Sequence, residues 1–270
     1  MELFKKTDPL IKIFLNQYGM NLLQIPREDV SIGDLYIYDP RIKAVSSKGS
    51  ITYFLTPEPK IPELTLGASM ADLTDTATKE VDFNAGLNLV SSFLEKFGVG
   101  LILGKVKADY ESKGAKTIKF SFPKAEKDSV DSMHLAKNLI DTKPILNHPF
   151  YSRNNRYFIV MATAKTSALT IAVQDKSKRN ADIDVKALNQ ELASANTKID
   201  KDSNSAITFN GRKKLVFAVE LQELLYDEKA KKIQLKPSRE YIKLKGKRKG
   251  ATPQIKKQPG IDDSVFINLI

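Results

Sequence analysis

Hydrophobic and polar residues alternate along the second half of the chain, which predicts β-strands with one apolar face. The longest such stretch covers residues 157–173, and the parity of its apolar positions reverses part-way along. That slip indicates a bulge or a turn near residues 165–167. Alternation returns over residues 207–221, where the dipeptide Asn210-Gly211 predicts a tight turn between two strands.

The first half of the chain mixes helix and strand signals. Residues 86–97 carry apolar side chains at helical spacing and predict an amphipathic helix. Residues 105–110 and 117–122 alternate on either side of a turn at residues 112–114, which predicts a β-hairpin. The remaining expected elements are helices at residues 8–19 and 128–140, strands at 21–25 and 34–38, a loop at 56–63, and a strand, a short helix and a strand within 183–202.

Together these elements predict an α+β fold, a twisted antiparallel sheet with helices packed around it. Residues 1–238 are expected to form one compact domain. Residues 239–260 are basic, contain proline and glycine and have no apolar period, so they are expected to form a linker. The chain then ends in an apolar segment, which is expected to pack back on the domain and comprises Val265, Phe266, Ile267, Leu269 and Ile270.

The composition supports a folded core and excludes several kinds of site. Hydrophobic residues make up 41% of the 270 residues, which is enough for one large domain or two small ones. The chain has no cysteine, which excludes disulfides, thiolate catalysis and cysteine-based metal sites. The first residues lack a signal-peptide pattern, and no stretch reaches the roughly 20 mostly apolar residues of a spanning helix. We therefore expect the chain to be made as a soluble cytoplasmic protein.

No residue is predicted to have a catalytic, cofactor-binding or metal-binding role. The glycine-rich stretch at residues 98–105 lacks the spacing of a phosphate loop and the Ser or Thr after its lysine, so these glycines are expected to end a helix. His134 and His148 lack a metal-type spacing, and no serine-nucleophile motif accompanies them. The adjacent carboxylates Glu28 and Asp29 are expected to form a turn or a salt bridge.

The charge of the chain leaves more than one class of partner open. The formal net charge is +11, and residues 239–270 contribute +5 of it, from eight Lys or Arg against three acids. A basic surface suits nucleic acid and anionic lipid equally well. The alternative to a membrane protein is therefore a nucleic-acid-binding module that uses the basic tail. That tail lacks interleaved aromatic residues apart from Tyr241 and contains no recognised nucleic-acid-binding motif. A hydrolase that acts through Asp and Glu is a third class.

Five stretches, in their order along the chain, resemble the bacterial gasdermins. They lie within residues 10–236 and read YGMNLLQIPREDVSIGDLYI, GLNLVSSFLEKFGVGLILGKVKADYESKGAKTIKFSF, DSVDSMHLAKNLI, RYFIVMATAKTSALTIAV and ITFNGRKKLVFAVELQELLYD. None is a sharp motif, and the resemblance lies in their order and in the total length. It implies a gasdermin-like pore-forming domain followed by a short inhibitory tail, with no enzymatic activity and no cofactor.

The resemblance also implies a mode of action. The protein would be monomeric and inactive while its tail is attached, and a partner protease would cut before the tail. The freed domain would oligomerise on the inner membrane into a large β-barrel pore and kill the cell in antiphage defence. The region around the predicted helix at residues 86–97 would refold into membrane strands. Many bacterial members carry an acylated cysteine near the N-terminus, a feature that this cysteine-free chain lacks.

Candidate sites follow from the linker and from the basic residues. Cleavage is expected at one bond between residues 239 and 258. The bond after Arg248 is the first candidate and the bond after Lys247 the second, and Leu244 is the candidate if the protease prefers an apolar residue. The lysines along the first predicted hairpin are expected to contact anionic lipid, and they are Lys105, Lys107, Lys113, Lys116 and Lys119. The expected partners are thus an activating protease, anionic membrane lipids and further copies of the chain after cleavage, but not nucleic acid.

Overall fold

The computed structural model describes residue 14 and residues 18–41, 44–70, 81–97, 100, 103–175, 198–201 and 206–236. The fold is α+β, a mostly antiparallel sheet with a few helices, as the sequence predicts. The domain boundary expected at residue 238, the linker and the apolar tail lie outside the described residues, as does most of the helix expected at residues 8–19.

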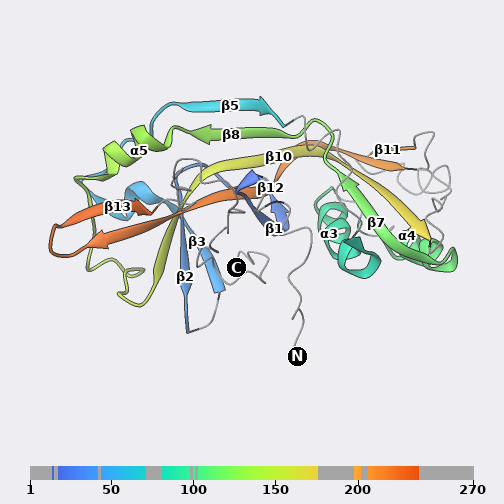
Figure 1. Ribbon diagram of the computed structural model, residues 1–270, viewed down its shortest axis with the longest axis horizontal. Helices are drawn as coiled ribbons and strands as arrows, with labels where there is room; N and C mark the ends of the chain where they lie inside the picture. The colour runs from blue at the N-terminus through green and yellow to red at the C-terminus, as the bar shows by residue number, and fades with distance from the viewer. Residues whose placement is uncertain are drawn as a thin grey trace, which may run out of the picture.

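Two long strands form the axis of the sheet. β10 (Arg156–Asp175) and β12 (Ile207–Asp227) pair antiparallel and run along the length of the molecule (Figure 1). Shorter strands join this ribbon at successive points. β10 pairs in turn with β2 (Asp34–Asp39), β8 (Glu126–Val130) and β7 (Ala115–Ser121). β12 pairs in turn with β11 (Lys198–Lys201), β1 (Asn21–Arg27) and β13 (Lys232–Lys236).

The other elements extend or cover this sheet. β3 (Ala44–Ser50) pairs with β2, β5 (Leu64–Ser69) with β8, and β6 (Val81–Asp82) with β7. β4 (Leu55–Thr56) and β9 (Lys143–Pro144) form a separate small sheet. The described helices are η2 (Ile51–Tyr53), α3 (Phe83–Lys96), α4 (Leu103–Ser112) and α5 (Ser132–Leu139).

Buried side chains form separate cores along the ribbon. The distal core lies between α3, α4, β7, β11 and the adjoining parts of β10 and β12. The proximal core lies at the other end, between α5, η2, β13 and the start of β10. A third core joins β1, β2 and β3 to the middle of the ribbon through side chains such as Leu23, Tyr36 and Val219. We call the two ends of the molecule the distal half and the proximal half after these cores.

The ladder between β10 and β12 is interrupted three times. Met161 is an extra residue on β10, Phe217 is an extra residue on β12, and residues 211–214 of β12 stand opposite the single residue Ser167. The third interruption confirms the slip that the sequence predicts near residues 165–167. Bulges increase the local twist and bend of a strand pair, so these interruptions mark where the ribbon changes direction.

The hairpin predicted over residues 105–122 is wrong in its first half, which is the helix α4. Val106 and Tyr110 are fully buried and stand four residues apart, so they share one face of a helix. Lys107 and Glu111 form an ion pair of 3.8 Å at the same spacing. Residues 105–110 alternate like a strand, but their apolar residues also recur at i and i+4 like those of a helix. Six residues are too few to distinguish the two periods.

Two other predictions about element ends are also wrong. β12 continues through Asn210-Gly211 without a hairpin turn, because Asn210 still pairs with β10 and the strand then leaves the ladder for four residues. The helix predicted over residues 128–140 begins at Ser132, since Asp131 Oδ1 accepts a hydrogen bond of 2.8 Å from His134 N and caps it. The strands expected near 21–25 and 34–38 and the helix over 86–97 are confirmed.

Candidate functional site

One face of the distal half is covered by α3 (Figure 1). Val90, Phe93 and Leu94 of this helix, with Phe97 just after it, are buried in the same core as side chains of β7, β10, β11 and β12. These positions recur at helical spacing, so the helix presents one apolar stripe to the sheet. Removal of α3 would therefore expose an apolar surface of the distal strands to water.

An aromatic stack forms the centre of the distal core. Phe122, just after β7, and Phe217 of β12 lie parallel, with ring centroids 4.3 Å apart and planes 2° apart. Phe93 of α3 tilts against both rings at centroid distances of 5.9 and 6.3 Å. Phe14 meets both rings edge-on at 5.7 and 5.8 Å. Such pairs contribute about 0.5–1.5 kcal/mol each beyond area burial, so the stack joins helix to sheet.

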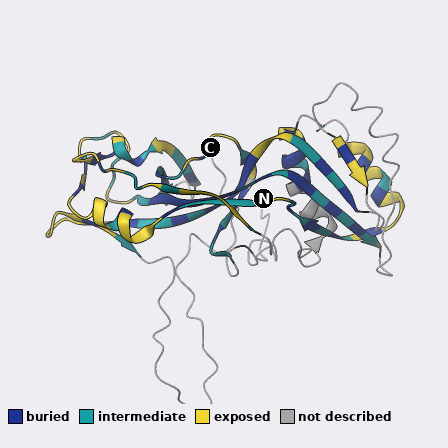
Figure 2. Cartoon of the chain, turned by 90° about the horizontal axis from the view of Figure 1, so that it is seen from above, coloured by how far each residue is buried: buried dark blue, intermediate teal, exposed yellow. Residues whose placement is uncertain are grey.

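Beneath α3, buried and partly exposed residues alternate along the strands (Figure 2). On β10, Leu169, Ile171 and Val173 are buried, whereas Thr170 and Gln174 are partly exposed. β7 and the first residues of β12 alternate in the same way. A strand of a membrane barrel alternates between apolar residues that face lipid and polar residues that line the lumen. The distal strands have this pattern, and in the structure their apolar face is turned toward α3.

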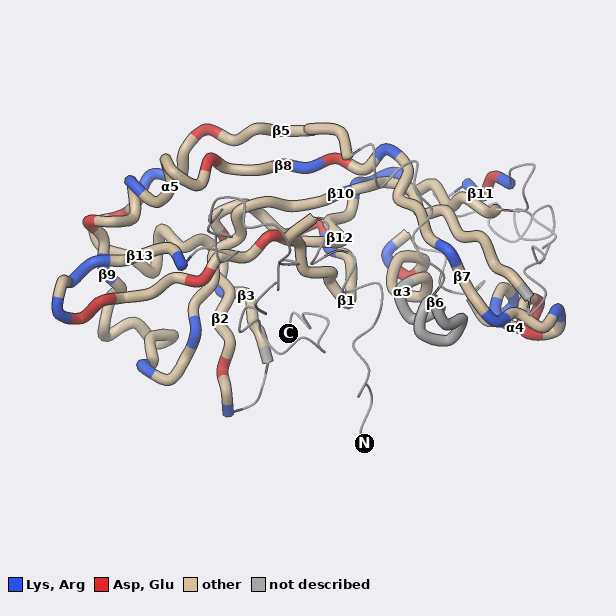
Figure 3. Tube along the Cα trace, viewed as in Figure 1, with Lys and Arg blue, Asp and Glu red and all other residues tan. Residues whose placement is uncertain are grey.

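The lysines predicted to contact lipid gather at the α4–β7 end of the distal half (Figure 3). Lys105 and Lys107 lie on α4 rather than on a strand, and Lys113, Lys116 and Lys119 lie in the following turn and on β7. All are exposed except Lys119, which is half-buried. Across residues 103–121, five lysines outnumber two acids, which leaves a net charge of +3. The two acids, on α4, pair with Lys107 and Lys113.

The remaining predicted sites lie outside the described residues. They are the cleavage candidates Leu244, Lys247 and Arg248 and the tail residues Val265, Phe266, Ile267, Leu269 and Ile270. Of the glycine-rich stretch, residues 100 and 103–105 are described, and residues 103–105, with Gly104 and Lys105 among them, lie in α4. The stretch therefore leads into a helix, whereas the sequence predicts a strand there.

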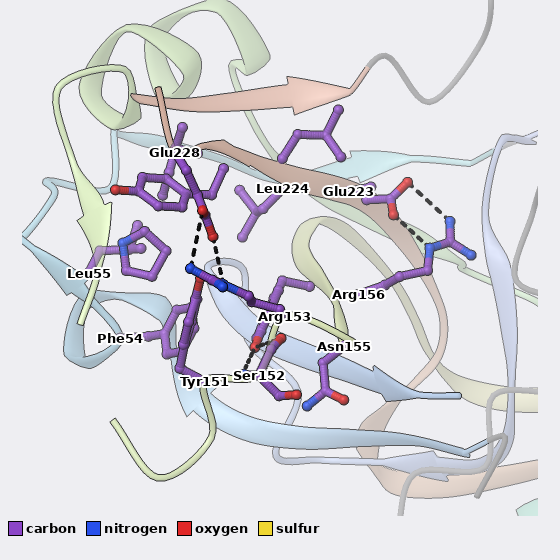
Figure 4. Close-up of a pocket in the computed structure, with 15 residues that line it drawn as sticks. Phe54, Leu55, Tyr151, Ser152, Arg153, Asn155, Arg156, Glu223, Leu224 and Glu228 are labelled. Carbon is purple, nitrogen blue, oxygen red and sulfur yellow. Dashed lines mark hydrogen bonds and ion pairs between the residues drawn. The ribbon is translucent and has the colours of Figure 1, made fainter. Parts of the chain in front are cut away.

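A cavity of about 340 Å³ opens in the proximal half, away from α3 (Figure 4). Phe54 and Tyr157 stack in its wall with centroids 5.1 Å apart, and Tyr151 stacks on Tyr157 at 6.2 Å. Arg153 and Glu228 form an ion pair of 2.9 Å beside these rings, as Figure 4 shows. The sequence does not predict this cavity, because its lining comes from three separate chain segments.

The cavity lining does not assemble a nucleophile with a general base among the described residues. Its serine, Ser152, donates its backbone N–H to the Tyr157 hydroxyl at 2.5 Å, and that hydroxyl donates to the Ser152 carbonyl. Burial raises the pKa of Tyr157 above its ordinary value, so the phenol stays protonated at neutral pH. The polar groups of the lining therefore hold the loop before β10 in place.

Glu223, at the edge of the cavity, binds two cations. Arg156 donates to its two carboxylate oxygens at 2.6 and 3.0 Å, and Lys236 Nζ donates to Oε2 at 3.2 Å. Burial alone would raise the pKa of Glu223, but the bonds from Arg156, and then from Lys236, bring it below its ordinary value. The Glu223 side chain is 11% exposed. The three charges tie β10, β12 and β13 together.

We expect Glu223→Gln to lower the free energy of unfolding by about 1–2 kcal/mol at pH 7, because two cations lose their partner in a mostly buried site. The lowered pKa of Glu223 means that its contribution is complete above the unfolded-state pKa of about 4.3 and is lost as the pH falls through the folded-state value. The difference in the free energy of unfolding between the wild type and Glu223→Gln should therefore shrink below about pH 4. Urea titrations across this pH range measure it.

The matched control is Glu228→Gln, which breaks the ion pair with Arg153. Their side chains are 78% exposed for Arg153 and 53% for Glu228, so the loss should stay within about 0.5 kcal/mol. Equal losses in the two variants would contradict a special role for Glu223.

His148 and the carboxylates Glu28 and Asp29, which are adjacent in sequence, make contacts that stabilise the fold. His148 packs edge-on against Phe54 at a centroid distance of 5.4 Å, and its Nδ1 accepts a hydrogen bond from the Phe150 backbone. Asp29 pairs with Arg27 at 2.7 Å, and Glu28 pairs with Lys213 at 2.7 Å.

In the part of the chain that the structure describes, no cluster of three His, Asp or Glu is placed to hold a metal ion. Within that same part, none of the helices combines the length and the hydropathy needed to cross a membrane.

Comparison with known proteins places these features in a family. The model of the Bacterial Gasdermin Family matches residues 23–231, most of the chain. Gasdermin bGSDM of Vitiosangium sp. (strain GDMCC 1.1324) is 24% identical over 225 residues, which are 81% of this chain and 81% of that protein. Gasdermin bGSDM of Gillisia limnaea is 22% identical over 226 residues, or 82% of this chain and 83% of that protein.

A solved structure agrees with the fold. The structure of a bacterial gasdermin from Bradyrhizobium tropiciagri is similar to this chain with a TM-score of 0.63 and 19% sequence identity. The similarity covers 86% of this chain and 91% of that chain. It therefore extends along the ribbon of β10 and β12 and is not confined to one half.

Proposed function

Because this chain belongs to the bacterial gasdermin family, a family of pore-forming proteins rather than enzymes, we propose that it is a pore held inactive by its carboxyl-terminal tail. Removal of the tail by a protease lets the remaining domain assemble with further copies. The assembly is a large β-barrel pore in the inner membrane, and loss of the membrane barrier kills the cell in antiphage defence. The observation that carries this proposal is the family match over residues 23–231.

The distal half supplies the strands that such a pore needs. A sheet that spans lipid must close on itself, because unpaired strand edges are not satisfied there. One chain contributes a few strands, and a ring of copies closes the barrel. The apolar residues of β7, β10 and β12 that α3 covers in the resting protein would face lipid in the pore. The α3 region therefore has to leave the sheet before the strands can insert.

The linker supplies the cleavage site. Residues 239–258 hold several basic residues in a stretch with no apolar period, and a protease with an acidic specificity pocket would accept them. The bond after Arg248 is the first candidate and the bond after Lys247 the second, with Leu244 for a protease that prefers an apolar residue. Release of a dye trapped in vesicles, measured for the intact and the cut chain, tests the proposal.

The lysines of α4 and β7 are proposed to attract the freed domain to anionic lipid. Replacing Lys105, Lys107 and Lys116 by Gln should lower the affinity of the cut protein for phosphatidylglycerol-containing vesicles by about 100-fold at low salt. Each basic residue near an anionic surface contributes about 1 kcal/mol, and 1.4 kcal/mol is a factor of ten. Vesicle co-sedimentation measures the binding, and added salt should reduce it for the unsubstituted protein.

Three exposed lysines of the proximal half, Lys229, Lys231 and Lys232, are the matched control. Their replacement by Gln removes the same charge, and binding should change by less than about threefold if the α4–β7 end faces the membrane. Equal effects of the two triple variants, or equal leakage from neutral and anionic vesicles at all salt concentrations, would contradict the proposed lipid contact.

A further inference from the structure

The backbone of Gly211 lies directly against the ring of Phe97. An ideal Cβ at residue 211 would lie 2.5 Å from Cδ1, 2.6 Å from Cε1 and 3.1 Å from Cγ of that ring. These distances are shorter than van der Waals contact, so a side chain at residue 211 would have to displace the ring. Phe97 is 7% exposed and follows the last residue of α3. Gly211 thus allows the end of α3 to touch the main chain of β12.

The close approach, and not the backbone conformation, requires glycine at this position. Gly211 is not among the described glycines with a positive φ. It begins residues 211–214, the four residues of β12 that stand opposite the single residue Ser167 of β10. Glycine within a strand commonly marks a bulge where another group approaches the backbone. The sequence does not reveal this role, because Asn-Gly is also the strongest signal for a hairpin turn.

Neighbouring contacts hold this part of β12 in place but are weaker. Lys213 pairs with Glu28 at 2.7 Å, and Lys214 pairs with Glu126 of β8 at 2.5 Å. Three of these four side chains are 47% or more exposed, and exposed ion pairs contribute little. The ring of Phe97, in contrast, is buried and lies against the main chain of Gly211.

The Phe97 ring is connected to the centre of the distal core. Its centroid lies 5.8 Å from that of Phe93, and Phe93 in turn contacts Phe122 and Phe217. Close-packed interiors transmit a local displacement to neighbouring side chains. A shift of Phe97 away from Gly211 therefore loosens the carboxyl end of α3. Through Phe93, it also weakens the packing of α3 against the aromatic stack.

We propose that the Phe97–Gly211 contact is a latch that holds α3 on the sheet and opposes pore formation in addition to the tail. This inference rests on the proposed function, in which α3 has to leave the sheet. A latch of this kind adds to the restraint by the tail, so that each of them lowers the population of the open state and the loss of either one raises it. Loosening the latch should then let the uncut protein open, and locking it should keep the cut protein closed.

The loosening test uses Gly211→Ala in the full-length, uncut chain. The added methyl group displaces the Phe97 ring, and dye release from vesicles of phosphatidylethanolamine with phosphatidylglycerol should rise by about tenfold or more over the uncut wild type. Gly104→Ala is the matched control, because it lies in the same half and its Cβ would meet no atom within 4 Å. Leakage by Gly211→Ala no greater than that by Gly104→Ala would count against the latch.

The locking test uses the absence of cysteine from the chain. In the double variant Phe97→Cys, Gly211→Cys, the sulfur of residue 97 would sit near the ring Cγ position, 3.1 Å from the ideal Cβ at residue 211. That separation suits a disulfide, because an S–S bond of about 2.05 Å places each sulfur about 3 Å from the Cβ of the other cysteine. After the linker is cut, the oxidised protein should remain closed, and a reducing agent should restore dye release.

The locking test also covers the case in which Gly211→Ala fails to fold, since the double variant removes the ring and the steric overlap together. Failure of the disulfide to form, or equal leakage by the oxidised and reduced forms after cutting, would overturn the latch. Failure of the cut wild type to leak would instead overturn the proposed function, so the two ideas fail separately. Cutting and disulfide formation are both verified by mass spectrometry before the leakage is measured.

Discussion

Cutting a foreign protease site inserted between residues 239 and 258 is expected to convert a protein that leaves vesicles intact into one that empties them. While attached, the tail is held near the domain at an effective concentration of about millimolar. After the cut, in a micromolar protein solution, it is about a thousandfold more dilute. A tail that binds with a dissociation constant between these values is docked before the cut and mostly released after it.

The control for this experiment is the same chain with a scrambled protease site at the same position. It should remain inactive in the presence of the protease, which excludes an effect of the protease itself. In bacteria, induction of the protease should stop growth only with the cleavable site. Complete cutting that leaves bacteria healthy and vesicles intact would contradict the proposed pore function.

The largest effect on stability is expected from Phe217→Ala. Phe217 is fully buried and stacks on Phe122 with their ring centroids 4.3 Å apart. Removing a buried phenyl ring costs about 3–5 kcal/mol, from lost burial and the cavity left behind. Since whole domains are stable by about 5–15 kcal/mol, this change should lower the urea midpoint strongly. It should also expose apolar surface, detectable by dye binding.

Tyr53→Ala provides the comparison, because Tyr53 is also aromatic but 76% exposed. Its removal should change the free energy of unfolding by no more than about 0.5 kcal/mol. A loss of less than about 1 kcal/mol for Phe217→Ala would show that the aromatic stack does not organise the distal core.

The sequence predicts the parts of this fold that have long, regular patterns. The alternating residues of β10 and β12 are predicted as strand, and α3, whose apolar positions repeat at helical spacing, is predicted as helix. The slip near residues 165–167 is also visible in the sequence, since the apolar positions of β10 change parity there. These signals are local, and a single sequence contains them.

The errors arise where a distant contact decides between local alternatives. Residues 103–112 fit either period, and the burial of Val106 and Tyr110 in the distal core selects the helix. Asn210-Gly211 fits a hairpin turn, but the ring of Phe97 occupies the space above Gly211 and β12 continues. The cavity beside Glu223 is not predictable from local patterns, because its wall forms only when residues near 54, 155 and 225 meet.

The arrangement of separate cores along one shared ribbon has a consequence for cooperativity. Hydrogen exchange in proteins reveals contiguous units that open at different free energies. The distal and proximal cores share β10 and β12 as backbone but bury different side chains. Amides under α3 can therefore exchange through a partial opening that leaves the proximal core protected. A protein divided in this way can rebuild one half of its sheet while the other half remains folded as an anchor for it.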